Sequence, residues 1–306
     1  PSTTYAFTVK VGYTNTLVAS AGGETALRAM IVAQLHDVES RFVGFTHDYK
    51  FTPVSFYSYS GSSDFEASRP HTEADLLLIY DERDTANGGW DGSTHSVIHS
   101  WQEAGSTLAV FSAHATQGLS HEFGHPLGAI DIYAMDVNAS TNPISHTDFH
   151  SADNFDSIMR YPYDRPPLWD AYSRCIIEKN GAHFDPAVPA VSQTLPSAYQ
   201  VKVTSTSGAS ISGASVKLYP VNWYSYAVSS TASVTGSTAS NGVFQLPANP
   251  FHPMEDPNAP WRTAASNFLI QVTKGSQTSY TWLPIAAAGL AACNGQSDLT
   301  ITIALP

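Results

Sequence analysis

Residues 121–131, HEFGHPLGAID, combine the residue types of a metal site in one short stretch. His121 and His125 are four residues apart, so on a helix they project from one face and a single ion can reach both rings. Glu122 lies about 100° around the helix from His121, which places its carboxylate beside the ion, where it can hydrogen-bond a water. Five consecutive residues therefore offer two metal ligands and a general base.

A third ligand must come from further along the chain, because a catalytic zinc site takes three protein ligands and leaves one position open for water. Gly128 permits a left-handed turn that would bring the chain back under the metal, and Asp131 follows three residues later. We expect Asp131 to be the third ligand. Asp136, His146 and His150 are the alternatives, and either histidine would give an all-nitrogen site.

The stretch HEFGHPLGAID resembles the metzincin pattern HExxHxxGxxH with aspartate in the last position, and is similar to the snapalysin-type bacterial variant of that pattern. This resemblance covers about residues 1–185. It implies a catalytic zinc ion held by His121, His125 and Asp131, with Glu122 as the general base. The aspartate should make the zinc less Lewis-acidic than a third histidine would.

A second motif, FDSIMRYP at 155–162, resembles the astacin-like Met-turn. The resemblance implies that Met159 forms a hydrophobic floor beneath the metal, and that Tyr161 can approach the zinc and stabilise the tetrahedral intermediate. It further implies that residues 106–112 form the edge strand that pairs with an extended substrate. Pro126 departs from the pattern: it lacks an N–H and should bend or end the helix early.

The elements that would position these residues alternate between strand and helix patterns in the first half of the chain. Apolar residues at helical spacing predict a helix at 24–42, and a second helix is expected at 114–127 with Gly128 as its stop. Strands are predicted at 5–13, 52–60, 74–82 and 106–112. The continuous apolar run of the third of these strands suits a covered, central position in a sheet.

The character of the chain changes after the proline-rich stretch 185–198. We expect a catalytic α/β metzincin-like domain at 1–187, a linker at 188–198 and an all-β sandwich domain at 199–306, which resembles the prealbumin-like accessory domains of secreted peptidases. Short alternating or β-branched runs predict strands at 199–206, 214–221, 226–234, 242–248, 267–274, 279–285 and 299–305.

Composition limits the partners of the protein. The 306 residues include 26 acidic and 14 basic side chains, for a net charge of −12, and basic residues do not cluster, which argues against nucleic acid and anionic membranes. No apolar run approaches the ~20 residues of a membrane helix. The chain begins at Pro1 without an initiator methionine, so we expect a mature secreted form. We also expect a monomer. Cys175 and Cys293 fit either one disulfide or two buried thiols.

Three further features of the sequence could bind a metal or carry a modification. Residues 81–92, DERDTANGGWDG, carry several oxygen ligands for a structural Ca²⁺, but the spacing is not that of an EF-hand and a solvated loop is favoured. The histidine pairs in HSVIH (95–99) and HTDFH (146–150) lack an adjacent glutamate and are expected to be ordinary surface or core histidines. Asn138 begins the one Asn-x-Ser/Thr sequon.

The sequence as a whole predicts a secreted zinc endopeptidase that hydrolyses protein or peptide substrates by a metal-activated water. Two alternatives stay open at this point. The first is a zinc protease restricted to glycosylated proteins through its β-sandwich. The second is a non-catalytic binding or adhesion protein whose metal is structural.

Overall fold

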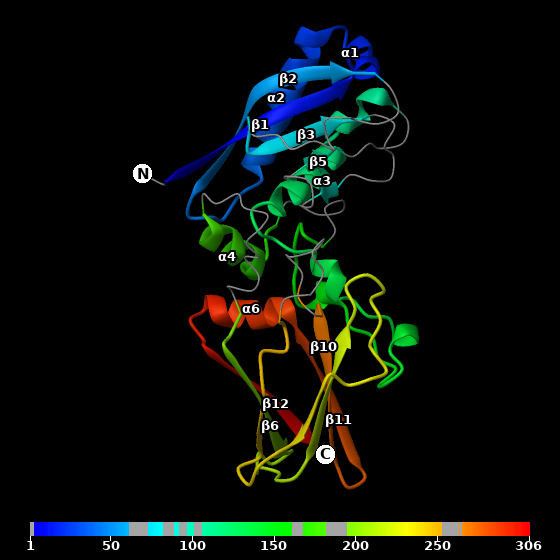
Figure 1. The fold of residues 1–306 in the computed structure, drawn as a ribbon, viewed down its shortest axis with the longest axis vertical. Helices are drawn as coiled ribbons and strands as arrows, with labels where there is room; N and C mark the ends of the chain where they lie inside the picture. Colours follow the sequence, from blue (N-terminus) through cyan, green and yellow to red (C-terminus); the bar gives the residue numbers. More distant parts are fainter. Residues whose placement is uncertain are drawn as a thin grey trace. The chain divides into compact units, whose positions relative to one another are not determined.

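The computed structural model describes residues 3–60, 73–81, 89–91, 97–100, 106–160, 168–181, 195–252, 263 and 265–306. The fold is mixed α/β, with more residues in strands than in helices and three sheets among the described residues (Figure 1). The chain forms two compact units. The first comprises Pro1–Ile130 and Asp156–Val188, and the second comprises Asp131–Phe155 and Pro189–Pro306.

The first unit is built on a five-stranded sheet of order β2-β1-β3-β5-β4. Strand β1 pairs in parallel with β2 and β3, β3 pairs in parallel with β5, and β4 runs antiparallel to β5 at one end of the sheet. All five residues of β3 are buried, which confirms the covered central position predicted for this apolar run. The strands are β1 Thr4–Thr14, β2 Asp48–Tyr59, β3 Leu76–Tyr80, β4 Gly89–Asp91 and β5 Val97–His99. The helices are α1 Asn15–Ser20, α2 Glu24–Ser40, η3 Thr107–Phe111, α3 Ala113–Gly124 and α4 Ala171–Asn180.

A buried hydrogen-bond network joins α2, β3 and α3. The side-chain amide of Gln34 donates to Val110 O at 2.7 Å and to Thr116 Oγ1 at 2.9 Å, and its carbonyl accepts from the Tyr80 hydroxyl at 2.7 Å. Burial raises the pKa of Tyr80, so its phenol stays protonated and remains a donor. Phe123 of α3 also packs edge-on against Phe51 of β2, with ring centroids 4.4 Å apart. These contacts fix the helix that carries the candidate metal ligands against the sheet.

The strand predicted at 106–112 is wrong, because this segment forms the 3-10 helix η3. Ser106 caps it through its side chain, and the backbone bonds Ala109 N to Ser106 O and Ser112 N to Ala109 O close its turns. Val110 is buried and Phe111 stacks on Tyr80, so two adjacent apolar residues of this short segment contact the core. A short apolar run does not by itself distinguish strand from helix.

The second unit contains two sheets, one of order β11-β10-β7-β8 and one of order β12-β6-β9. Phe251 lies between them in the core, since it contacts Tyr199 of β6 on one side and Phe268 of β10 on the other. The strands are β6 Ala198–Ser205, β7 Ser215–Val221, β8 Val234–Ser237, β9 Val243–Gln245, β10 Asn267–Lys274, β11 Gln277–Pro284 and β12 Asp298–Leu305. Its helices are η4 Ile132–Met135, η5 Ala139–Thr141, η6 Ser151–Asp153 and α6 Ile285–Cys293.

Two expectations for this unit need correction. Residues 226–234 do not form the predicted strand: Val228 makes one isolated bridge to Val221, and β8 begins only at Val234. The tail is also not all-β, because Ile285–Cys293, rich in alanine, forms helix α6. Alanine is the strongest helix former, and this preference outweighed the β character of the surrounding sequence.

The segment Asp131–Phe155 belongs to the second unit, although the sequence places it inside the first domain. The buried side-chain amide of Asn267 donates to Met135 O at 3.3 Å. The ring of Phe149 packs on Trp282, with ring centroids 5.4 Å apart. The Thr141 hydroxyl donates to Tyr226 O at 3.1 Å. The segment therefore takes its packing partners from strands and turns that follow more than 80 residues later.

Both cysteines are disulfide-bonded, so the thiol alternative does not apply to Cys175 and Cys293. Within the part of the chain that the structure describes, no helix is both long enough and apolar enough to cross a membrane. The loop considered for Ca²⁺, residues 81–92, lies for the most part outside the described residues, as does most of the predicted linker at 188–198.

We expect Gln34→Leu to lower the free energy of unfolding by about 2–3 kcal/mol, because it leaves the Tyr80 hydroxyl and Val110 O buried without their present partner. Urea unfolding of the full chain measures this loss. The matched control is Ala33→Leu, an exposed position on the same helix, which should change stability by less than about 0.5 kcal/mol. Equal stability of the two variants would show that the network does not anchor α3.

Candidate metal centre

Helix α3 ends in the turn that carries the candidate ligands. Ser112 caps its N-terminus by accepting from Ala115 N at 3.0 Å, and the helix ends at Gly124 with His125 still in a helical conformation. Pro126 follows directly and has no N–H to continue the ladder, which confirms the early end predicted from its position. His121 and His125 nevertheless keep their one-turn spacing.

Gly128 closes this turn. It has a positive φ of 102°, its N–H bonds to His125 O at 2.8 Å, and Ala129 N bonds to Gly124 O at 3.0 Å. This pair of bonds is the Schellman arrangement that ends many helices, and it needs a residue that tolerates positive φ. Gly128 has the positive φ expected of it and closes the turn after α3, but the helix itself ends at Gly124, before the predicted residue 127.

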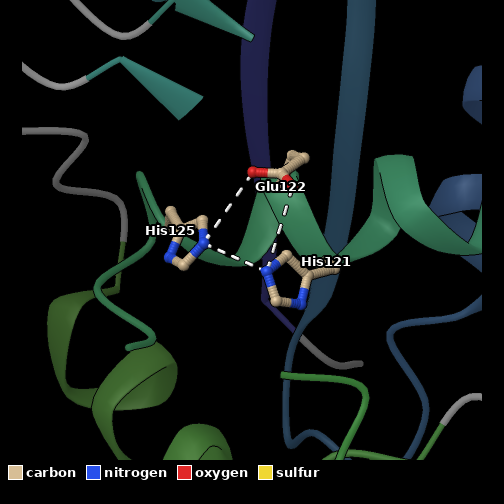
Figure 2. A group of neighbouring side chains, drawn as sticks. All are labelled: His121, Glu122 and His125. Atoms are coloured by element: carbon tan, nitrogen blue, oxygen red, sulfur yellow. Dashed lines mark hydrogen bonds and ion pairs between the residues drawn. The ribbon is translucent and has the colours of Figure 1, made fainter. Parts of the chain in front are cut away.

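The side chains of His121, Glu122 and His125 point toward one another (Figure 2), and their ligand atoms all lie within 4.8 Å of one another. The two Nε2 atoms are 3.2 Å apart. The Glu122 carboxylate lies 3.9 Å from the Nε2 of His121 and 3.8 Å from that of His125. The Glu122 side chain is 13% exposed, so it is largely shielded from solvent.

Backbone carbonyls orient both imidazole rings. The Nδ1 of His121 lies 2.9 Å from Ile158 O, and the Nδ1 of His125 lies 3.0 Å from Ala129 O. A carbonyl oxygen only accepts, so each Nδ1 carries the hydrogen and each Nε2 of the neutral rings has its lone pair available. This is the tautomer that a metal-binding histidine takes, and the bond to its other nitrogen fixes the ring.

This donor set fits a metal ion. Two nitrogen lone pairs and a carboxylate crowd the same small region, and a cation would satisfy all three. Two nitrogens bound to one tetrahedral zinc at ~2.0–2.1 Å are about 3.3 Å apart, close to the observed 3.2 Å between the two Nε2 atoms. The group could therefore hold a metal ion, and the spacing of its two nitrogens already matches that of a zinc site.

The predicted Met-turn residue lies directly against α3. Met159 is fully buried, and a Cβ placed on Gly124 would be 2.9 Å from its sulfur and 2.9 Å from the ring of Trp169. A residue with a side chain would not fit at Gly124, between the two histidines, because the Met159 and Trp169 side chains fill that space. The sequence analysis assigned no role to Gly124 or Trp169, and no spacing rule would have paired them.

The other predicted site residues are placed as follows. Asp131 is half-buried and precedes η4 as the first residue of the second unit, and its role as the third ligand stays a prediction. Tyr161 lies outside the described residues. Asp136 accepts a hydrogen bond from Ser151 N at 2.6 Å.

Neither histidine of the HTDFH stretch joins the metal group found among the described residues, and both His146 and His150 are exposed. Both are surface histidines, one of the two ordinary roles expected for them. Of the HSVIH stretch, His99 is half-buried at the end of β5, whereas His95 lies outside the described residues.

Comparison with known proteins identifies no family for this chain. No family model matches it, and no curated protein matches it. Solved structures with partial likeness include catechol 1,2-dioxygenase of Acinetobacter radioresistens (17% identity, TM-score 0.22, 37% of this chain and 53% of that one). Another is a chaperone–substrate complex (13% identity, TM-score 0.36, 59% of this chain and 35% of that one). A third is the major pilin subunit of Bacillus cereus (14% identity, TM-score 0.21, 36% of this chain and 30% of that one). The chain spans about half the length of the dioxygenase and about a third of the other two. At these TM-scores the likenesses carry no argument about its fold or function.

We expect Gly124→Ala to lower the free energy of unfolding by about 1–3 kcal/mol, because the added methyl group would overlap Met159 and Trp169. Trp169 has little freedom to move, since it is buried and its Nε1 donates to Arg41 O at 2.9 Å. Guanidinium unfolding checks the prediction. Met159→Leu conserves apolar volume in the same space and should cost less than about 1.5 kcal/mol. A Gly124→Ala variant as stable as the native chain would contradict this packing.

Proposed function

We propose that the protein is a zinc-dependent endopeptidase of metzincin-like type, with His121 and His125 as ligands, Asp131 as the third ligand and Glu122 as the general base. One observation carries the proposal: two correctly oriented imidazole nitrogens lie 3.2 Å apart with a carboxylate within 4 Å of both. Met159 beneath the helix and a mostly parallel sheet whose end strand is antiparallel give further support.

We assign Glu122 to proton transfer rather than to holding the ion. Its two oxygens are each nearly 4 Å from a different Nε2. A zinc ion bound by the histidines would supply an acidified water and polarise the substrate carbonyl. With the ion bound, Glu122 would accept a proton from that water and pass it to the leaving amine. His121 and His125 stay fixed through their Nδ1 bonds during this transfer.

Strand β4 is the surface we assign to the substrate, in place of residues 106–112. Gly89–Asp91 forms the end strand of the described sheet, pairs with β5 on one side and contacts α3. An extended peptide can add to such an edge through main-chain hydrogen bonds, which suits a substrate recognised by shape rather than by one side chain. The net charge of −12 is consistent with a protein or peptide substrate rather than a polyanion.

Secretion, a monomeric state and a preference for glycosylated proteins are further proposals. The disulfide form of both cysteines supports secretion, because such bonds persist in oxidising compartments.

We expect Glu122→Gln to keep zinc affinity while lowering kcat/KM for peptide hydrolysis by about 10²–10⁴-fold, because the amide cannot accept the proton. Zinc content and steady-state hydrolysis of a mixed peptide library measure the two effects separately. Glu24→Gln, a surface carboxylate paired with Arg28, serves as the matched control and should leave both values unchanged. Native turnover in Glu122→Gln would refute the assigned mechanism.

Removal of the metal is expected to abolish hydrolysis, and re-addition of one equivalent of Zn²⁺ should restore it. Metal analysis before and after treatment with a chelator, alongside the peptide assay, tests this. A chain that holds one zinc with four protein ligands and cleaves nothing would instead support the binding-protein alternative.

A further inference from the structure

Asp170 is a buried carboxylate that accepts four hydrogen bonds. Its Oδ1 accepts from the backbone N–H groups of Tyr172 and Ser173, both at 2.9 Å, and so caps helix α4. Its Oδ2 accepts from two hydroxyls, those of Ser157 and Ser173, both at 2.5 Å. Capping explains the Oδ1 bonds. It does not explain why a hydroxyl from another segment, Ser157, meets the same carboxylate.

Ser157 passes this interaction on to the Met-turn. Its hydroxyl also accepts from Met159 N at 3.1 Å. Because a backbone N–H can only donate, the single hydroxyl proton must point to Asp170. A hydroxyl that donates to a carboxylate is a stronger acceptor on its other side, since hydrogen bonds in a chain polarise one another.

The same peptide group then reaches the candidate metal ligand. Met159 N–H and Ile158 C=O are the two ends of one peptide unit, which is trans, so they point in opposite directions. Ile158 O accepts from the Nδ1 of His121 at 2.9 Å. Ile158 N donates to Leu168 O at 2.6 Å, which holds this turn on its other side.

We infer that Asp170 is a positioning residue for His121, acting through the Ser157 hydroxyl and the Ile158–Met159 peptide. The buried carboxylate polarises this peptide, strengthens the hydrogen bond that His121 donates, and thereby raises the electron density at its Nε2. Metal-binding histidines commonly donate directly to a carboxylate or carbonyl. Here a serine and a peptide group connect the carboxylate to the ring. The inference rests on the proposed metal centre only for its effect on metal affinity.

Ser157→Ala and Ser173→Ala form a matched pair, because each removes one buried hydroxyl that donates to the same oxygen of Asp170 at the same distance. Only Ser157 continues to Met159 N. The first readout is the His121 Nδ1–H proton resonance in the full-length, metal-free protein labelled with ¹⁵N-histidine. An upfield shift in Ser157→Ala, with no shift in Ser173→Ala, is expected.

The second readout is the affinity for Zn²⁺, measured by competition with a chelating dye. Ser157→Ala should weaken binding about tenfold, the lower end of what loss of an outer-shell partner costs, while Ser173→Ala should stay within about twofold of the native chain. Asp170→Asn keeps an acceptor for the α4 cap but removes the charge, and should change both readouts in the same direction as Ser157→Ala.

Equal changes in the two serine variants, or an unshifted resonance in Ser157→Ala, would overturn the inference, since a purely structural role for Asp170 treats the two hydroxyls alike. Failure of the native chain to bind Zn²⁺ would overturn the proposed metal centre instead. The resonance of the metal-free protein would then still decide whether Asp170 acts on His121.

Discussion

Two imidazole nitrogens held 3.2 Å apart, with a carboxylate nearly 4 Å from each, are the constraint on which the rest of the first unit depends. Like partial charges at this distance repel, so the arrangement persists only because other contacts fix both rings. The site also lies at the C-terminal end of α3, where the aligned peptide dipoles add negative potential. Ring orientation, crowding and helix dipole all favour the same occupant, a cation.

Contacts to the sheet and to helix α2 fix helix α3, which carries His121 and ends next to His125. Gln34 bonds to the segments on both sides of the η3–α3 junction, and Phe123 packs on Phe51 of the sheet, so α3 cannot slide or rotate without breaking buried polar bonds. At the next residue of α3, Met159 and Trp169 fill the space that Gly124 leaves open. The ligand-bearing turn is therefore held by contacts both to a β-sheet and to Met159, which lies more than 30 residues later in sequence.

Local patterns in the sequence predicted what local physics determines. The apolar run of β3, the positive-φ turn at Gly128 and the early helix end before Pro126 each follow from a few neighbouring residues, and each agrees with the structure. The segment 106–112 was misassigned because its helical state depends on a cap at Ser106 and a distant amide, Gln34. The Asp170–Ser157 bond was not foreseen for a similar reason: aspartate before an apolar helix signals a cap, but nothing in the sequence indicates its second partner.

The allocation of Asp131–Phe155 to the second unit bears on the order in which the protein is synthesised and folded. The hydrogen bond to Met135 O cannot form until Asn267, 132 residues downstream, has been synthesised. At ribosomal rates of 5–20 residues per second this gap lasts about 7–26 s. During that interval the first unit's strands and helices up to Ile130 are already available to fold, whereas the segment that follows is not yet packed. Nascent chains would therefore pass through a stage in which the His121–His125 turn has been made but the residues beyond Asp131 have no packing partners. Chaperone binding or proteolysis at that stage would act on this segment.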